Sequence, residues 1–304
     1  MITSQSAFAL GANLPWIRYG LDFGANGWQP DGGLAATGIA PDAAVRIAEL
    51  RERGVTVFRW FVFCDGRAGI RFSDSGEPLG LDERLLMDLD TALAFASGAG
   101  IQIVPTLFDF LWCAPRETVA GVETRGREAV FADARRRARL FDVILAPVLE
   151  RFGRHPAVAA WDLINEPEWI RTVSRATMKT FLTDAATLVH RLASQPVTVG
   201  LASAQGIDLV RAADLDFYQV HWYDKFEKRW PLGRPVAQLR VDKPVVLGEF
   251  PTRGSQRRPE EILLLARDAG YAAAWFWSAL ADDPASDYTA AVEGLDRLAN
   301  GMRE

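Results

Sequence analysis

The segment Trp161-Asp-Leu-Ile-Asn-Glu-Pro-Glu168 begins as a short apolar strand and closes with polar residues. A second segment, Val245-Val-Leu-Gly-Glu-Phe-Pro251, has the same design and also reaches a glutamate. A charged residue that closes an apolar strand points either into the mouth of a barrel or into an ion pair. The two segments therefore predict strands that carry Glu166 and Glu249 at their C-terminal ends.

Strand-like runs of this kind alternate with helical patterns along the whole chain. This order predicts parallel strands joined by helical crossovers. The expected strands are 17–23, 55–63, 101–108, 158–164, 197–202, 217–222, 244–249 and 272–278. Eight strands close a barrel, and barrels of roughly 250 residues are commonly one domain. We therefore expect a single (β/α)8 TIM barrel in which residues 1–304 form one catalytic domain.

Several helix signals agree with this arrangement. Pro41 and Gly54 bracket one helix, and Ser174 can cap another. Pro147 is expected to kink or split a long helix over 128–152. The crossovers after the fifth and sixth strands look short and irregular. The longest loops follow strands two, three and six, at the end where barrel enzymes build their active sites.

Composition excludes several classes of function. The chain has 304 residues, 49% of them hydrophobic and 24% charged, with a net charge of −5. This charge gives no electrostatic reason to bind nucleic acid or an anionic membrane. Three scattered histidines do not form a metal-binding set, and no glycine-rich phosphate loop precedes a helix. We therefore expect neither a metal nor a cofactor.

Location and redox state are predicted from the same sequence. Residues Met1 to Pro15 lack the features of a signal peptide, and the longest apolar run, Tyr271 to Ala281, is too short to span a bilayer. The chain is therefore expected to be soluble, and cytoplasmic unless a leader was removed. Cys64 and Cys113 are expected to be free thiols, although a bridge between neighbouring loops stays open. The oligomeric state is not predicted.

The two glutamates suit a particular chemistry when they are taken together. They are 249 − 166 = 83 residues apart, which crosses three βα units, so their strands face each other across the mouth. Two carboxyl groups in this position suit glycoside hydrolysis, in which one protonates the leaving oxygen and the other acts at the anomeric carbon. Either glutamate alone is also explained by a loop cap or an ion pair with arginine.

These segments resemble the signature of clan A glycoside hydrolases, particularly family 5. Asn165-Glu166-Pro167 and Gly248-Glu249-Phe250 carry the resemblance after the fourth and seventh strands. The resemblance implies a retaining β-glycosidase, active on gluco- or manno-configured oligosaccharides, with Glu166 as acid/base and Glu249 as nucleophile. Further matches along the chain are Arg59, His221, Tyr223 and Trp277.

The resemblance also implies roles for the residues around the pair. Arg59 is expected near the nucleophile, Asn165 at the sugar 2-OH, and Trp277 under the sugar ring. The residues leave simpler readings open: a structural ion pair for Arg59, a turn role for Asn165 and a core position for His221. A transglycosylase with the same site, or a sugar-binding barrel without catalysis, is the alternative function.

The sequence departs from the family pattern at the third strand. Family 5 enzymes usually carry a histidine near its end, whereas this segment reads Pro105-Thr-Leu-Phe-Asp-Phe-Leu-Trp-Cys113. Asp109 and Trp112 stand where a sugar-contacting histidine is expected. We therefore expect these two residues to contact the substrate, and the exact family and sugar specificity stay open.

Overall fold

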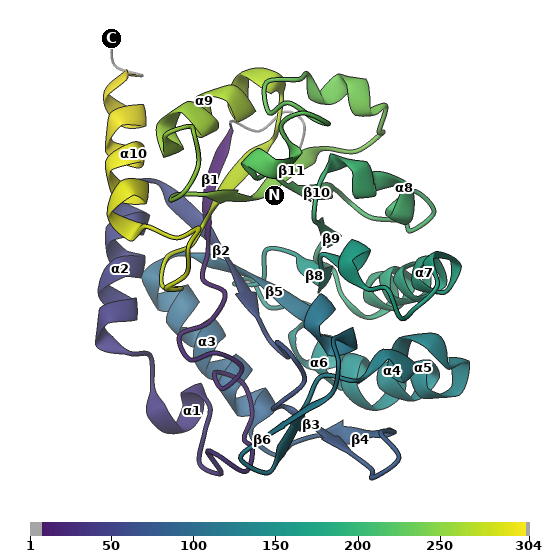
Figure 1. Cartoon of the computed structure of the whole chain (residues 1–304). Coiled ribbons are helices and arrows are strands. Elements are labelled where there is room, and N and C mark those ends of the chain that lie inside the picture. Colours follow the sequence, from purple (N-terminus) through teal and green to yellow (C-terminus); the bar gives the residue numbers. More distant parts are fainter. Residues whose placement is uncertain (1–7, 302–304) are drawn as a thin grey trace.

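The computed structural model describes residues 8–301, and its centre is a closed barrel of eight parallel strands (Figure 1). Neighbouring strands in the barrel follow one another in sequence, as expected for repeated βα units. The expectation of a (β/α)8 barrel is confirmed. The strands are β1 (Ala9–Asn13), β2 (Val55–Phe61), β5 (Gln102–Asp109), β8 (Trp161–Asn165), β9 (Val197–Leu201), β10 (Tyr218–His221), β11 (Val245–Pro251) and β12 (Ala273–Trp277).

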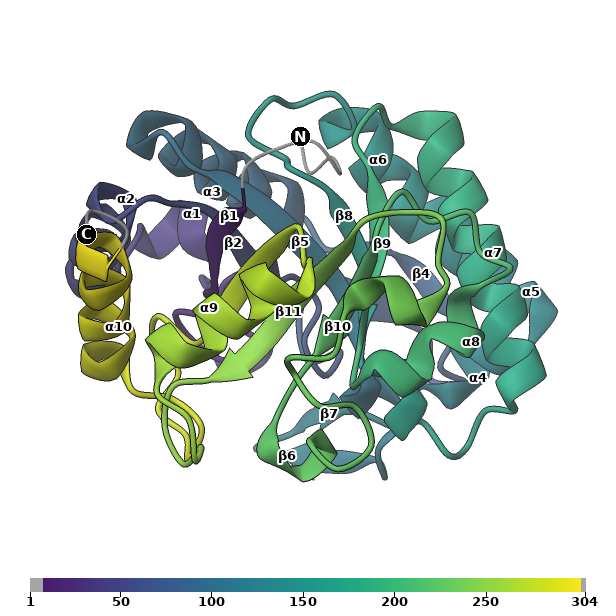
Figure 2. The same ribbon diagram turned by 90° about the horizontal axis from the view of Figure 1, so that it is seen from above.

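Helices surround the barrel on its outside, which is clearest in the view from above (Figure 2). Two hairpins, β3–β4 (Ile70–Phe72 and Pro78–Leu81) and β6–β7 (Glu117–Val119 and Val122–Thr124), lie in the loops after β2 and β5. The helices are α1 (Leu34–Thr37), α2 (Pro41–Glu52), α3 (Leu85–Ala99), α4 (Glu128–Ala132), α5 (Ala134–Leu140), α6 (Ala146–Phe152), α7 (Arg175–Leu192), α8 (Ile207–Val210), α9 (Pro259–Ala269) and α10 (Tyr288–Gly301).

Most helix signals are confirmed. Ser174 caps α7 by accepting a hydrogen bond from the Thr177 amide at 3.1 Å. The crossovers after β9 and β10 hold only α8 and short 3₁₀ turns, as expected. The helical stretch over 128–152 breaks in two ways. A π-helical segment, 141–145, stands just before Pro147, and Asp133 interrupts the stretch earlier and caps α5.

The predicted first strand, 17–23, is wrong. The true strand is β1, and residues 17–23 form a loop in which the Asp22 carboxylate accepts the amides of Ile17 and Arg18. The reason lies inside the barrel, where the indole of Trp275 fills the space beside Gly11. A Cβ at Gly11 would lie 2.2 Å from that ring. Gly11 must therefore lack a side chain, and β1, in which Ala9, Gly11 and Ala12 are small, carries little hydrophobic signal.

The inside of the barrel has an apolar layer and a polar layer. Alternate residues of a barrel strand point inward, and the apolar layer includes Val57, Val104, Ala160, Val246 and Trp275. Two residues further along their strands stand Arg59, Thr106 and Asp162, all fully buried. The polar layer lies directly beneath the C-terminal mouth, so it can hold the side chains that line the mouth.

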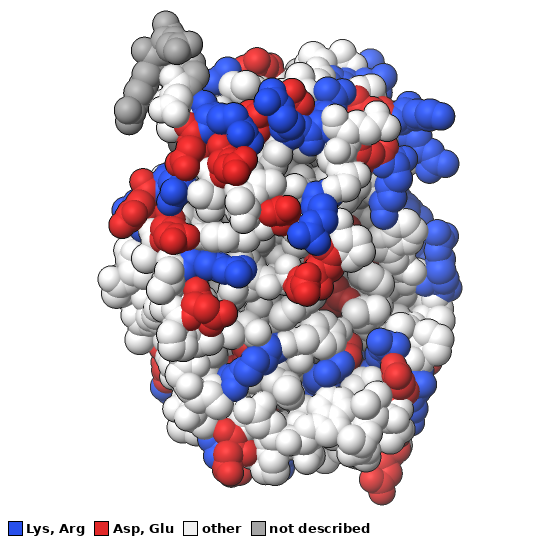
Figure 3. Space-filling model, turned by 60° about the vertical axis from the view of Figure 1, so that its left-hand side comes forward, with Lys and Arg blue, Asp and Glu red and all other residues white. Residues whose placement is uncertain are grey.

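Three further features concern the surface charge, the two cysteines and the hydrophobicity of the helices. Acidic and basic side chains are interspersed over most of the face drawn in Figure 3. Cys64 and Cys113 are both buried and free, as expected. Within residues 8–301 we find no helix with the length and apolar character that crossing a membrane requires.

Candidate active site

Glu166 leaves the end of β8 in a conformation that aims its carboxylate at the barrel mouth. Its backbone is left-handed, with φ of 47°, and Pro167 follows and begins a short 3₁₀ turn that reaches Trp169. A non-glycine residue held in this region costs on the order of 1 kcal/mol or more, and such strain concentrates at functional sites. The Glu166 side chain lines the cavity at the C-terminal end of the barrel.

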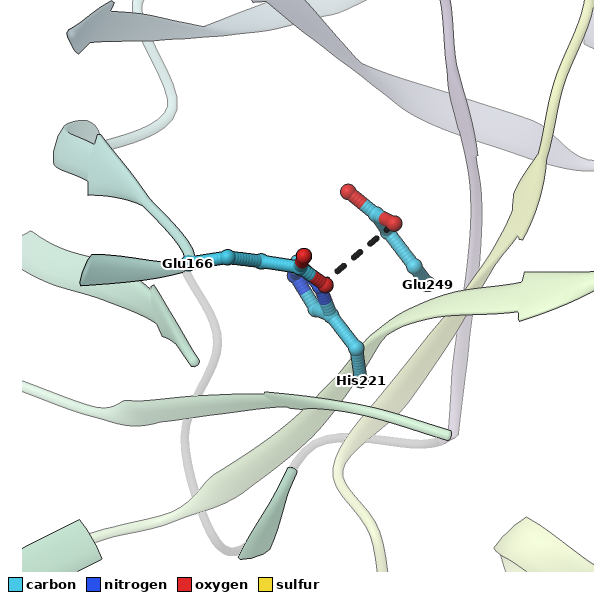
Figure 4. A group of neighbouring side chains, drawn as sticks. All are labelled: Glu166, His221 and Glu249. Carbon is cyan, nitrogen blue, oxygen red and sulfur yellow. Dashed lines mark hydrogen bonds and ion pairs between the residues drawn. The ribbon is translucent and has the colours of Figure 1, made fainter. Parts of the chain in front are cut away.

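Glu249 reaches the same cavity from β11, and the two carboxylates approach each other there (Figure 4). One oxygen of each carboxylate and a ring nitrogen of His221 all lie within 4.8 Å of one another. The predicted meeting of the two glutamates across the barrel mouth is thus what the structure shows.

Two donors hold the carboxylate of Glu249. Arg59 Nη1 donates to Oε1 at 2.5 Å, and the Tyr223 hydroxyl donates to Oε2 at 3.0 Å. Burial raises the pKa of Tyr223 well above its usual range, so the hydroxyl keeps its proton and remains a donor. Burial also raises the pKa of Glu249, but His221 and the Arg59 guanidinium oppose this effect. Of the two glutamates, Glu249 is the one in direct contact with a permanent cation.

Glu166 has a less polar setting. The Trp169 indole Nε1 donates to its Oε2 at 2.7 Å, and His221 Nδ1 lies 2.8 Å from its Oε1. Burial raises the pKa of Glu166, and the bond from Trp169 and the positive charge of Lys225 reduce that rise. A carboxyl group with a raised pKa can hold a proton closer to neutral pH than an ordinary glutamate can.

His221 stands between the two carboxylates at the end of β10. Its Nδ1 is 2.8 Å from Glu166 Oε1 and 3.4 Å from Glu249 Oε2. Burial lowers the pKa of His221 to about 4, so the ring is neutral at neutral pH and carries one proton. Its Nε2 has no hydrogen-bond partner among the described residues. His221 is thus buried, and it contacts both glutamates from beneath the cavity.

A chain of hydrogen bonds fixes Asn165. Arg59 Nη2 donates to Asn165 Oδ1 at 2.9 Å, and Asn165 Nδ2 donates to Asp109 Oδ2 at 2.8 Å. Arg59 Nε also pairs with Asp162 at 2.7 Å, so the arginine is both a structural ion pair and a partner of Glu249. Burial raises the pKa of Asp109 to about 7. The amide of Asn165 is thus held rigidly beside Glu166.

The cavity around these groups has a volume of about 320 Å³ and largely aromatic walls. Trp277, Trp16 and Phe61 lie together, with ring centroids 6.0 to 6.2 Å apart. Trp277 is anchored by a bond from its Nε1 to Asp283 Oδ2 at 2.7 Å. This volume is near the lower end of the roughly 300–1,000 Å³ typical of small-ligand sites.

Trp112 does not lie where the sequence places it. The chain curls into a 3₁₀ turn, Phe110–Cys113, which turns Trp112 into the core, where it is fully buried against Phe108 and Phe131. It does not line the cavity, so its proposed contact with substrate is a wrong prediction. Asp109 does line the cavity, but its oxygens accept bonds from Asn165 and the Leu111 amide.

Several residues of the cavity were missed by sequence reasoning. Trp16, Tyr19, Phe61 and Lys225 line it, and Asp162 supports Arg59 from below. Phe61 could have been found, because it stands two residues after Arg59 on the same strand and so faces the same side. The other three lining residues come from loops, where strand alternation gives no signal.

Glu166, His221 and Glu249 also form a group that could hold a metal ion. Both carboxylates already accept hydrogen bonds, however. Glu249 accepts from Arg59 and Tyr223, and Glu166 accepts from Trp169. A divalent cation in this group would also face the Arg59 guanidinium. The donor set fits a proton-transfer site better than a metal site.

Comparison with known proteins agrees with this geometry. No protein-family model matches the chain. A mannan endo-1,4-beta-mannosidase of Mytilus edulis is 25% identical over 320 residues, which cover 89% of this chain and 83% of the relative. The solved beta-1,4-D-mannanase of Cryptopygus antarcticus has a TM-score of 0.82 at 22% identity, covering 96% of this chain and 90% of that one.

A third similar protein, known from its solved structure, is named as a glycoside hydrolase of family 5. The glycoside hydrolase family 5 mannosidase of Rhizomucor miehei has a TM-score of 0.62 at 14% identity, covering 98% of this chain and 95% of that one. Structural likeness at these identities shows the shared fold. The chain is thus similar in sequence to mannan endo-1,4-beta-mannosidases and in fold to a glycoside hydrolase of family 5.

Proposed function

We propose that this protein is a retaining β-glycosidase that hydrolyses β-1,4-linked mannosides, with Glu166 as acid/base and Glu249 as nucleophile. The observation that carries the proposal is the meeting of two carboxylates with unequal surroundings, within 4.8 Å, at the mouth of the barrel. Retaining glycosidases hold their two carboxyl groups about 5–5.5 Å apart, whereas inverting enzymes need about 6.5–9.5 Å to admit a water.

In the first step Glu249 attacks the anomeric carbon while Glu166 protonates the leaving oxygen. Arg59 and Tyr223 hold the carboxylate of Glu249 in place and favour its ionised form. Because burial raises the pKa of Glu166, this residue holds a proton that it can donate to the leaving oxygen. The glycosyl-enzyme ester forms on Glu249, and the bond between the anomeric carbon and the leaving oxygen breaks.

In the second step a water molecule attacks the same carbon and releases Glu249. Glu166 lost its proton in the first step, so it now accepts one from the water. Once Glu249 is esterified it carries no negative charge, so no neighbouring anion at that position opposes the ionisation of Glu166. Each glutamate therefore serves both halves of the reaction and returns to its starting state.

The surrounding residues bind the sugar. We assign Trp277 to stacking against the sugar ring. The amide of Asn165, held in place by its own hydrogen bonds, is assigned to a hydrogen bond with the sugar 2-OH, which strengthens in the transition state. Manno configuration and the β-1,4 linkage are proposed because the relatives are named mannanases. The position of the 2-OH distinguishes mannose from glucose, so Asn165 is a candidate for that selection.

The proposal is tested by incubating the native chain with β-1,4-manno-oligosaccharides and with cello-oligosaccharides of equal length. We expect turnover of the mannosides with retention of anomeric configuration, read by NMR before mutarotation. Glu249→Ala should lose activity by on the order of 10⁴-fold or more. Glu150→Ala, on the exposed face of α6, is the matched control and should behave as the native chain.

Two alternatives give different results in the same experiment. A transglycosylase would return longer oligosaccharides in place of water-derived products. A barrel that binds sugars without catalysis would show saturable binding and no turnover by the native chain. The second outcome, or inverted products, would overturn the proposed function.

A further inference from the structure

A second cavity, of about 280 Å³, lies beside the catalytic one. Trp169 lines it and is 39% exposed, and the indole of the same residue donates to Glu166 at 2.7 Å. Lys225 lines the catalytic cavity and rests its ammonium nitrogen 5.1 Å from the centre of the Trp169 ring. The two cavities therefore adjoin at the contact between Trp169 and Lys225.

The second cavity is rich in positive charge. Arg171, Arg175 and Arg229 line it, all three are exposed, and none of their guanidinium groups forms an ion pair or hydrogen bond with a residue in the described part of the chain. The long helix α7 also begins at Arg175, so its partly positive N-terminus adds to the same field. We call the three side chains the arginine cluster.

Nearby acidic groups do not neutralise the arginine cluster. Glu168 lines the same cavity, but burial raises its pKa to about 7, and no ion pair joins it to an arginine within residues 8–301. Asp208, at the start of α8, bonds to Arg211 at 2.8 Å and also interacts with the charge of Arg175. Arg171 and Arg229 form no ion pair within residues 8–301, and unpaired guanidinium groups around a cavity indicate a site for an anion.

The position relative to Glu166 decides which part of a substrate reaches this cavity. The acid/base residue protonates the leaving oxygen, so the leaving group lies on its side of the cleaved bond. Trp169 contacts Glu166 directly, and the arginine cluster lies beyond Trp169. A sugar chain that leaves over Trp169 would therefore place a later unit beside the arginines.

We propose that the arginine cluster forms a leaving-group subsite for an anionic sugar unit, which carries a carboxylate or a phosphate. The planar fork of arginine suits both groups through paired hydrogen bonds. The subsite rests on the proposed function, because it names the class of mannoside that the same catalytic pair cleaves. The preferred substrate is thus an acidic manno-oligosaccharide, and a neutral one is cleaved more slowly.

The test compares chains of equal length that differ only in charge at the leaving-group end. Mannotriose, mannotetraose and mannopentaose are each oxidised to the terminal aldonate or reduced to the neutral alditol. A second arm uses the same chains with a 6-phosphate on the terminal unit, which distinguishes a phosphate site from a carboxylate site. The quantity measured is the ratio of kcat/KM for the charged and neutral forms, at low and high salt.

The native chain should favour the charged form, by up to about fivefold for each arginine engaged at low salt. The triple variant Arg171→Gln/Arg175→Gln/Arg229→Gln should bring the ratio to about one, and high salt should do the same. Arg139→Gln, an exposed arginine of α5 outside both cavities, is the matched control and should keep the native ratio.

Equal kcat/KM for charged and neutral chains at every length, or a preference that survives in the triple variant, would overturn the subsite. Either result leaves the proposed function standing, because the neutral chains are still cleaved. If the native chain cleaves no mannoside of either form, the proposed function itself fails. Because the ratio is internal to each variant, a partial loss of folded protein does not change it.

Discussion

The hydroxyl of Tyr223 is predicted to hold Glu249 in its ionised form, and Tyr223→Phe removes that hydroxyl alone. The bond to Glu249 Oε2 is 3.0 Å long in a site from which water is largely excluded. A hydrogen bond to a charged group contributes about 1.5–3 kcal/mol. At 1.36 kcal/mol for each pKa unit, its loss should raise the pKa of Glu249 by about one to two units.

The sign of the effect on activity follows from the role of Glu249. The nucleophile must be ionised to attack, so the acid limb of the pH profile of kcat/KM reports its pKa. We expect this limb to move to higher pH by about one to two units in Tyr223→Phe. The alkaline limb, which reports protonated Glu166, should stay in place. At the optimum, kcat/KM should fall by about 10- to 100-fold.

The assay is the full pH profile of kcat/KM for one manno-oligosaccharide, measured for both variants of a matched pair. Tyr218→Phe is the control, since Tyr218 begins β10, the strand that Tyr223 follows, at the opposite end of the barrel, and its hydroxyl contacts Asp242. A fall in rate with an unmoved acid limb would refute the reasoning. So would a control variant that shifts the limb equally.

Three further predictions follow from the same contacts. Glu166→Ala should slow oligosaccharide hydrolysis by about 10²–10⁴-fold and remove the alkaline limb, while aryl mannosides with an acidic phenol should still release their phenol rapidly, as a burst assay would show. Lys225→Met should move the alkaline limb to higher pH, because its positive charge lowers the pKa of Glu166, and added salt should shrink the difference between the two profiles. Glu168→Gln should stabilise the fold above about pH 7 and leave it unchanged near pH 4, in denaturant titrations at the two pH values. Burial raises the pKa of Glu168 from 4.5 to about 7, so its deprotonation destabilises the native state as pH rises through that range, by up to about 3 kcal/mol. An equal gain at both pH values would contradict this account.

The strands that could be predicted from the sequence are those whose side chains carry their own hydrophobic signal. β2, β5, β8, β9, β10, β11 and β12 overlap their predicted ranges because apolar residues fill them. β1 could not be found in this way, because Trp275 from a neighbouring strand occupies the volume that a larger residue at Gly11 would need. The residue that explains the missing side chain at position 11 is Trp275, which lies in β12 near the other end of the chain.

The same distinction separates the site residues that were predicted from those that were missed. Strand order predicted that Glu166 and Glu249 meet at the mouth, and alternation along β2 predicted the direction of Arg59. The left-handed backbone of Glu166 and the register shifts beside Glu249 belong to the folded structure. Trp112 lies three residues beyond β5, and a single 3₁₀ turn is enough to rotate it into the core. Lys225 belongs to a loop, and only the folded structure brings it against Trp169.

The neutral imidazole of His221 connects the two halves of the proposed reaction. It has one proton, and both carboxyl groups lie near Nδ1, so when that proton is on Nδ1 they compete for the same donor. When Glu249 becomes an ester it is a weaker acceptor, and the Nδ1 proton is then left to Glu166, which has just become a carboxylate. A hydrogen bond from His221 to ionised Glu166 lowers the pKa of Glu166. To accept a proton from water, Glu166 needs a pKa that is not too low. The single donor of His221 therefore orients Glu166 as a base in the second step, and the surrounding burial keeps its pKa high enough for that role.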